Sequence, residues 1–223
     1  MAVLHRSSVN VLMALSALVG SVAPALASGL PATPNLLSNG SFETTYVGSG
    51  GYCYLAGSIA SCGNPNQLTD WTGSAVVIAS DSGPWGTPSS LPGYSYGNQL
   101  VGLQNERYVE QALTLAAGAY DLSWSDAGRN NFGSGTSYEV RFNNNVLQTF
   151  DTSFGQAWTH HSLTFTSTGS GPLRFAGLAV NDDGTAFIDN LVLTAHVPEP
   201  QSLALVALAL GGLVFSTRRR TQR

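Results

Sequence analysis

The sequence contains no lysine, and its nine basic residues are all arginines. Five of these arginines lie close to the two ends of the chain. Residues 28–197 therefore hold four arginines against twelve acidic residues, which gives a formal charge of −8. A surface of this charge repels phosphate backbones and anionic lipid headgroups, so we expect no nucleic-acid partner. Neutral ligands and cations fit the composition better.

The sequence also lacks the local motifs of common hydrolases. It has no Gly-x-Ser-x-Gly elbow, no His-Glu-x-x-His helix and no paired cysteine and histidine. His160-His161 is the only histidine pair in residues 28–197, and because side chains alternate along a strand, the two rings should point to opposite faces. We interpret the pair as structural and expect no enzyme. Paired carboxylates for glycoside hydrolysis stay open as an alternative, because folding sets their spacing.

The N-terminal residues 1–27 have the order of a secretory signal peptide. Arg6 precedes an apolar stretch from Val9 to Val22, and Ala25 and Ala27 form a small-x-small cleavage site. We expect cleavage after Ala27 and export of the rest. A lasting membrane anchor is the alternative, but the apolar run is short for a span of about 20 residues.

The C-terminal end combines three features in a fixed order: a Pro-Glu-Pro element, an apolar segment from Leu203 to Phe215, and an arginine cluster. The arginines resist translocation and stay cytoplasmic, so they favour a topology in which the part of the chain before the apolar segment lies outside the cytoplasm. This order resembles the PEP-CTERM sorting signal of Gram-negative bacteria that secrete exopolysaccharide, and a plain membrane anchor is the alternative. The resemblance implies recognition by an exosortase-type membrane protease, only transient residence in the inner membrane, and delivery to the cell surface or extracellular matrix. The sorting residues are Val197, Pro198, Glu199, Pro200, Arg218, Arg219 and Arg220.

Between the ends, after a linker at residues 28–34, residues 35–195 alternate apolar and polar side chains in many short stretches. This pattern predicts an all-β fold, a jelly-roll β-sandwich of about 8–10 strands flanked by an N-terminal signal helix and a C-terminal hydrophobic helix in the tail, residues 196–223. Residues 44–98 form a long loop region. Asn143-Asn144-Asn145 supplies a hairpin turn. Strands are expected at Leu36–Glu43, Ala75–Ala79, Gln99–Gln104, Arg107–Leu115, Tyr120–Trp124, Tyr138–Phe142, Val146–Phe150, Trp158–Thr166, Leu173–Leu178 and Thr185–Thr194.

The loop region contains the two cysteines of the chain, Cys53 and Cys62. Export to an oxidising compartment permits a disulfide, and closing so short a loop stabilises a fold by roughly 2 to 3 kcal/mol. Metal binding is the weaker alternative, because no histidine lies near the pair in the sequence.

Two segments resemble galactose-binding-like jelly rolls, a group that includes carbohydrate-binding modules. They are Asn35–Glu43, at the start of the body, and Phe187–Leu193, at its end. The resemblance implies that these segments lie side by side and that a structural Ca²⁺ binds there, with Glu43 and Asp189 as the matching carboxylates. Asp189 would share a face with Phe187, Leu191 and Leu193, so a buried charge there needs a cation, an arginine or hydrogen bonds. Capping of backbone amides by Asp189 is the alternative.

Sugar binding requires aromatic faces together with planar polar groups. The candidates in predicted loops are Trp85, Tyr94, Tyr96, Arg129 and Asn130. Loop aromatics also commonly fold back to bury a loop. We therefore predict an exported, non-catalytic surface or matrix protein that binds polysaccharide. The alternatives are a structural spacer without a ligand and a polysaccharide hydrolase.

Overall fold

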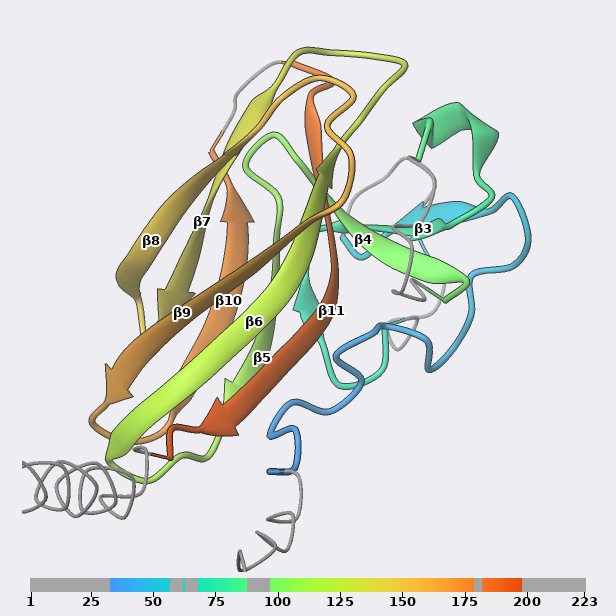
Figure 1. The fold of residues 1–223 in the computed structure, drawn as a ribbon. Coiled ribbons are helices and arrows are strands. Elements are labelled where there is room, and N and C mark those ends of the chain that lie inside the picture. Colours follow the sequence, from blue (N-terminus) through green and yellow to red (C-terminus); the bar gives the residue numbers. More distant parts are fainter. Residues whose placement is uncertain (1–32, 57–61, 63–67, 88–96, 179–181, 198–223) are drawn as a thin grey trace, which may run out of the picture. The chain divides into compact units, whose positions relative to one another are not determined.

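The computed structural model describes residues 33–56, 62, 68–87, 97–178 and 182–197. Two antiparallel sheets face each other and form a sandwich (Figure 1). The first sheet has six strands in the order β1-β3-β4-β11-β6-β9, and the second has five in the order β2-β5-β10-β7-β8. The strands are β1 (Tyr52–Tyr54), β2 (Thr72–Gly73), β3 (Val76–Ala79), β4 (Gln99–Gln104), β5 (Tyr108–Leu113), β6 (Gly118–Gly128), β7 (Thr136–Phe142), β8 (Asn145–Thr152), β9 (Thr159–Ser167), β10 (Gly171–Gly177) and β11 (Thr185–Ala195).

The all-β prediction is confirmed, and every expected strand except one coincides with a strand of the sandwich. The turn between β7 and β8 holds Asn143 and Asn144 at φ 47° and 66°, a conformation that asparagine tolerates better than most residues. The short strands β1 and β2 were missed by sequence reasoning. The only helix in the described ranges is the single 3₁₀ turn η1 (Gly83–Trp85), and none of them contains a helix long and apolar enough to cross a membrane.

The expected strand at Leu36–Glu43 is wrong. Asn39 and Phe42 have φ values of 49° and 59°, which break the extended backbone. The segment nevertheless runs beside β11 as the resemblance implied, because the backbone N–H of Leu36 donates to the Leu193 carbonyl at 2.8 Å. A Cβ atom at Gly40 would lie 2.1 Å from the Leu191 oxygen, so this contact requires glycine.

The main core lies between the sheets, and alternate residues of each strand point into it. Its largest fully buried side chains include Trp124 on β6 and Tyr138 on β7. A second, smaller cluster lies on the opposite face of the six-stranded sheet, under the loop that carries η1. Its members are Val76, Ile78, Trp85, Leu100, Ala127, Trp158 and Phe187.

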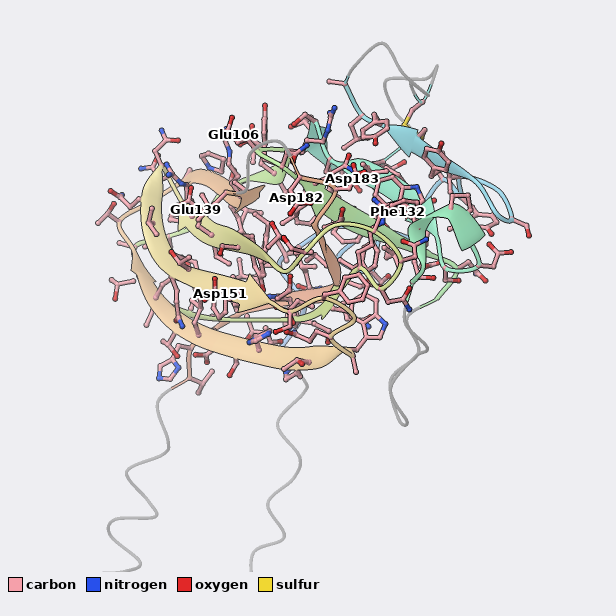
Figure 2. All side chains as sticks on the ribbon, turned by 90° about the horizontal axis from the view of Figure 1, so that it is seen from above. Glu106, Phe132, Glu139, Asp151, Asp182 and Asp183 are labelled. Atoms are coloured by element: carbon pink, nitrogen blue, oxygen red, sulfur yellow. A yellow bond between two sulfur atoms is a disulfide. The ribbon has the colours of Figure 1, made fainter. Side chains whose placement is uncertain are left out.

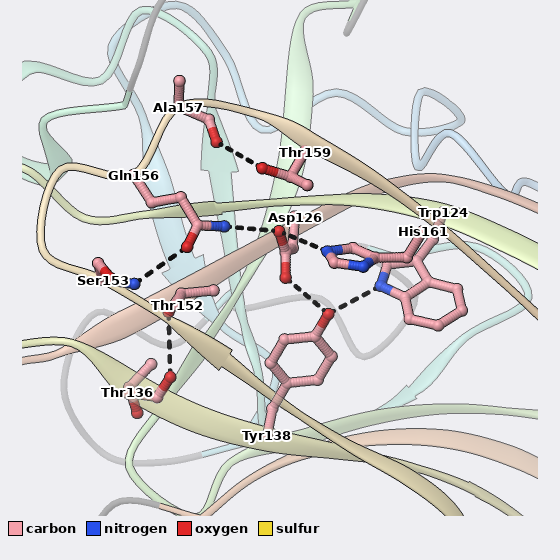
Figure 3. Close-up of polar contacts among 10 residues, drawn as sticks. All are labelled: Trp124, Asp126, Thr136, Tyr138, Thr152, Ser153, Gln156, Ala157, Thr159 and His161. Atoms are coloured by element: carbon pink, nitrogen blue, oxygen red, sulfur yellow. Dashed lines mark hydrogen bonds and ion pairs between the residues drawn. The ribbon is translucent and has the colours of Figure 1, made fainter.

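A hydrogen-bonded network crosses the main core (Figure 3). The indole N–H of Trp124 donates to the Tyr138 hydroxyl at 2.8 Å, and this hydroxyl donates to Asp126 Oδ2 at 2.8 Å. The other oxygen of Asp126 accepts from Gln156 Nε2 at 2.9 Å and lies 3.0 Å from His161 Nε2, without the alignment of a hydrogen bond. Burial, and secondly the charge of Asp126, raise the pKa of Tyr138. The network joins β6, β7 and β9 in one polar unit.

The two neighbouring histidines point to opposite faces of β9, as expected. The ring of His161 stacks on Trp124, with centroids 5.4 Å apart, whereas His160 is exposed. His161 therefore belongs to the structural network of the core.

Candidate functional site

The second cluster positions a surface pocket at one end of the six-stranded sheet. Trp85 enters this cluster from η1, whose turn ends at Gly86 with φ 53°. The pocket has a volume of about 220 Å³ and opens between β1, η1 and the loops that follow β6 and precede β11. We call it the aromatic pocket. Its lining residues are Tyr52, Tyr54, Pro84, Trp85, Gln104, Arg129, Phe132 and Asp183.

Arg129 lies against the wall of the aromatic pocket. Its guanidinium carbon is 4.5 Å from the centroid of the Trp85 ring and 5.2 Å from that of Phe132. Three of its N–H groups donate to protein acceptors: Nε to Asn131 Oδ1 at 2.9 Å, Nη1 to the Asp183 carbonyl at 3.2 Å, and Nη2 to the Pro84 carbonyl at 3.0 Å. Burial lowers the pKa of Arg129. This arginine ties three loops together around the indole.

A chain of hydrogen bonds forms the polar side of the aromatic pocket. The Tyr54 hydroxyl donates to Gln104 Oε1 at 2.9 Å, and Gln104 Nε2 donates to Asp183 Oδ1 at 3.1 Å. Gln104 is buried at the end of β4, and Asp183 is exposed in the loop before β11. The chain fixes both planar groups and leaves the Asp183 carboxylate at the surface.

Two exposed aromatic side chains form the rim of the aromatic pocket. Phe132 has an exposed fraction of 58%, and Tyr52 has one of 37%. Sequence reasoning missed both, although Tyr52 and Tyr54 flank Cys53 at the alternating spacing of a strand, and Phe132 closely follows the predicted Arg129 and Asn130. These rings supply the accessible apolar surface of the site.

The structure brings together only some of the predicted ligand residues. Trp85 and Arg129 both line the aromatic pocket, but only 4% of Trp85 is exposed, and its ring packs on Arg129 and against the tyrosines of β1. Asn130 is exposed in the same loop, and its side chain lies so close to Gly86 that a Cβ there would come within 2.2 Å of Asn130 Oδ1. Tyr94 and Tyr96 lie outside the described residues.

The predicted disulfide is confirmed: Cys53 and Cys62 are bonded, with their Cα atoms 4.8 Å apart. Cys53 lies in the middle of β1, between the two tyrosines that line the aromatic pocket. The bond therefore connects the pocket strand to the loop that follows it. The predicted cleavage residues Ala25 and Ala27 and the sorting residues from Pro198 onward lie outside the described residues, whereas Val197 is exposed just after β11.

The predicted metal ligands Glu43 and Asp189 interact electrostatically, but Asp189 shares its face of β11 with only one of its three expected neighbours. Asp189 follows Phe187 on the outer face of β11, while a bulge with Asn190 at φ 55° turns Leu191 and Leu193 into the main core. The expectation that Asp189 shares a face with these two leucines is wrong, because a bulge shifts the alternation by one residue.

Asp189 is fully buried. Its Oδ1 accepts from the backbone N–H of Asn190 at 2.6 Å, and its Oδ2 has no hydrogen-bond partner among the described residues. Burial raises the pKa of Asp189 well above its usual value, and the charge of Glu43 raises it further. Glu43 Oε1 accepts from the backbone N–H groups of Asn98 and Gln99 at 2.9 and 3.0 Å.

This orphaned carboxylate, with a second carboxylate near it, fits a hard cation. The fit needs further oxygen ligands from hydroxyl or carbonyl groups. In the described part of the chain, no three side chains of histidine, cysteine, aspartate or glutamate gather in an arrangement that could hold a metal ion.

A second hollow, of about 280 Å³, lies on the outer face of the five-stranded sheet. Its two arginines are engaged by carboxylates: Arg174 Nη2 lies 2.7 Å from Glu110 Oε2, and Arg141 pairs with Glu139. Arg174 also stacks on Tyr108 at 4.2 Å. This hollow contains none of the predicted ligand residues. The aromatic pocket is therefore the stronger candidate for a binding site.

Comparison with known proteins identifies the C-terminal tail. Residues 196–220 match the PEP-CTERM protein-sorting motif, which confirms the resemblance drawn from the order Pro-Glu-Pro, apolar segment and arginines. No curated protein matches the chain. The family match covers the tail alone.

Solved structures similar to the chain include carbohydrate-binding modules. TmCBM61, solved with β-1,4-galactotriose, is 17% identical with a TM-score of 0.41, over 74% of this chain and all of that one. A putative sugar-binding protein from Bacteroides thetaiotaomicron is 11% identical with a TM-score of 0.40, over 73% of this chain and all of that one. The module CBM36, solved with calcium and xylotriose, is 17% identical with a TM-score of 0.37, over 48% of this chain and 87% of that one. At these TM-scores the similarities carry no functional argument.

Proposed function

We propose that the chain is an exported, non-catalytic protein of the cell surface or extracellular matrix, which binds polysaccharide through the aromatic pocket of a single domain, residues 35–195. An exosortase-type protease would process the tail after the signal peptide is removed, so that the inner membrane holds the protein only transiently. The tail motif at residues 196–220 supports the sorting part. The pocket supports the binding part.

One observation carries the binding proposal: exposed rings stand beside fixed polar groups in one concave site. Phe132 and Tyr52 offer apolar faces to the C–H groups of a sugar, while the Tyr54–Gln104–Asp183 chain offers oriented hydrogen-bonding groups. Sites for neutral polar ligands combine these two elements. The aromatic pocket is open to the surface, so it can accept sugar units from the middle of a long polymer.

The binding test compares two exposed phenylalanines. The full chain, purified in detergent, is measured against a panel of soluble polysaccharides by affinity electrophoresis and calorimetry. We expect Phe132→Ala to weaken binding roughly fivefold, because stacking contacts contribute roughly 1 kcal/mol. Phe154→Ala is the matched control, since Phe154 is 54% exposed but does not line the pocket. Equal binding by both variants, or no binding to any polysaccharide, would contradict the proposal.

We also propose that Asp189 and Glu43 contribute to a structural Ca²⁺ site. The buried Asp189 Oδ2 without a partner among the described residues supports this, because a cation would offset both its burial and the repulsion from Glu43. Calcium should raise the Tm of the wild-type chain, magnesium should do so less, and Asp189→Asn should remove the response. A calcium response that survives in Asp189→Asn would count against these ligands.

A further inference from the structure

We infer that the aromatic pocket selects uncharged sugars and rejects uronic acids and other anionic glycans, and that the Asp183 carboxylate decides this choice. The inference rests on the proposed polysaccharide binding and names its substrate class. It depends on which charged groups near the pocket remain available to a ligand.

The arginine in the pocket wall is already engaged. Arg129 is only 8% exposed, three of its N–H groups donate to protein oxygens, and rings lie over the guanidinium at 4.5 and 5.2 Å. Recognition of a carboxylate by arginine normally uses two parallel N–H groups presented as a fork. Arg129 cannot present this fork without giving up contacts that hold Pro84 and Asn131.

A second arginine, Arg107, packs on a tyrosine of the pocket. Arg107 Nη1 donates to the carbonyls of Ser74 and Ala56 at 2.9 and 3.2 Å. Its guanidinium carbon lies 4.4 Å from the centroid of the Tyr54 ring. Both arginines therefore brace aromatic rings of the pocket, and Arg107 is not among the residues that line it.

In contrast to the engaged Arg129, the acidic side chain of the pocket is available to a ligand. Asp183 is exposed at the pocket, and only its Oδ1 receives a hydrogen bond from Gln104 among the described contacts. Asp182, next in the chain, bonds to the Gly184 N–H and to Ser134. Figure 2 shows Asp183 near Phe132, and both residues line the aromatic pocket, whereas Asp151, on β8, does not line it. A sugar carboxylate entering here would meet a fixed carboxylate of the same sign.

The charge of the whole domain acts in the same direction, since residues 28–197 carry a formal charge of −8. A neutral sugar avoids this repulsion, and its hydroxyls can donate to the Asp183 carboxylate. Hydrogen bonds to an ionised acceptor are stronger than those to a neutral one. The same side chain thus favours a hydroxyl and disfavours a carboxylate.

The test uses oligosaccharide pairs that share a backbone and differ only in oxidation at C6: mannohexaose against the hexamer of β-1,4-mannuronan, and cellohexaose against the hexamer of β-1,4-glucuronan. Calorimetry with the full chain at low salt should show at least tenfold tighter binding of the neutral member of a pair that binds. Raising the salt concentration should reduce the ratio of the two affinities, because screening weakens the repulsion between the sugar carboxylates and Asp183.

The decisive variant is Asp183→Asn, which keeps an oxygen acceptor for Gln104. It should reduce the ratio to threefold or less by strengthening uronate binding. Asp151→Asn makes the same charge change at a residue that does not line the pocket and should leave the ratio unchanged. Tighter binding of the uronates by the wild type, or equal ratios in the two variants, would overturn this inference alone. Absence of binding to any neutral or acidic polysaccharide would overturn the proposed function as well.

Discussion

Replacement of Tyr138 by phenylalanine isolates the polar network of the main core, because it removes one oxygen and keeps the ring. That oxygen accepts from Trp124 Nε1 and donates to Asp126 Oδ2, both at 2.8 Å, and all three residues are fully buried. The variant leaves one buried donor and one buried carboxylate oxygen without these partners.

The magnitude follows from the number of groups left unpaired. A buried donor or acceptor without a partner costs about 1 to 3 kcal/mol, and a charged one more, so Tyr138→Phe should lower the free energy of unfolding by about 3 to 5 kcal/mol. For a domain of this size, that loss corresponds to a fall in Tm of roughly 10 °C. Urea unfolding of the full chain, followed by tryptophan fluorescence, measures the free energy directly.

Tyr120→Phe provides the control. The Tyr120 hydroxyl donates to the Ala116 carbonyl at 3.0 Å, and Ala116 is exposed, so water can replace the lost donor. This change should cost only about 0.5 to 1.5 kcal/mol. If the loss in free energy of unfolding caused by Tyr138→Phe is within about 1 kcal/mol of the loss caused by Tyr120→Phe, the reasoning that the network stabilises the sandwich is refuted.

Three further predictions concern other parts of the chain. Cys53→Ala with Cys62→Ala should lower the free energy of unfolding by about 2 to 3 kcal/mol, the entropy of closing a short loop, and an unchanged urea midpoint would refute this. In the presence of a chelator, Asp189→Asn should be more stable than the wild type at pH 7 but not below about pH 4. Because the pKa of Asp189 is raised on folding, the folded chain binds more protons than the unfolded chain between about pH 4 and the folded pKa. The free energy of unfolding of the wild type therefore declines as the pH rises through this range. Parallel pH profiles of the two proteins would contradict this. Alanine at residues 198–200 should leave export intact but retain the protein at the inner membrane, and cell fractionation showing normal surface delivery would argue against sorting through this element.

The sequence determined those features that depend on local order along the chain. The tail motif at residues 196–220 is recognisable because it consists of three neighbouring elements, and the two cysteines left only one possible disulfide within the chain. The alternation of apolar and polar residues located the longer strands of both sheets but not β1 and β2, since strand side chains repeat every two residues and the two short strands hold too few of them. These features needed no knowledge of distant contacts.

Tertiary structure decided the binding site and the face of the predicted metal ligand. Phe132 and Asp183 lie about fifty residues apart in the sequence, and only the packing of their loops brings both to the aromatic pocket. Whether Trp85 exposes its ring depends on Arg129, which covers it from another loop. The bulge at Asn190 turned Leu191 and Leu193 to the inner face of β11 and left Asp189 on the outer face with Phe187, because an extra residue in the left-handed region reverses the alternation after it. Such effects arise from contacts between segments far apart in the chain, which no local pattern encodes.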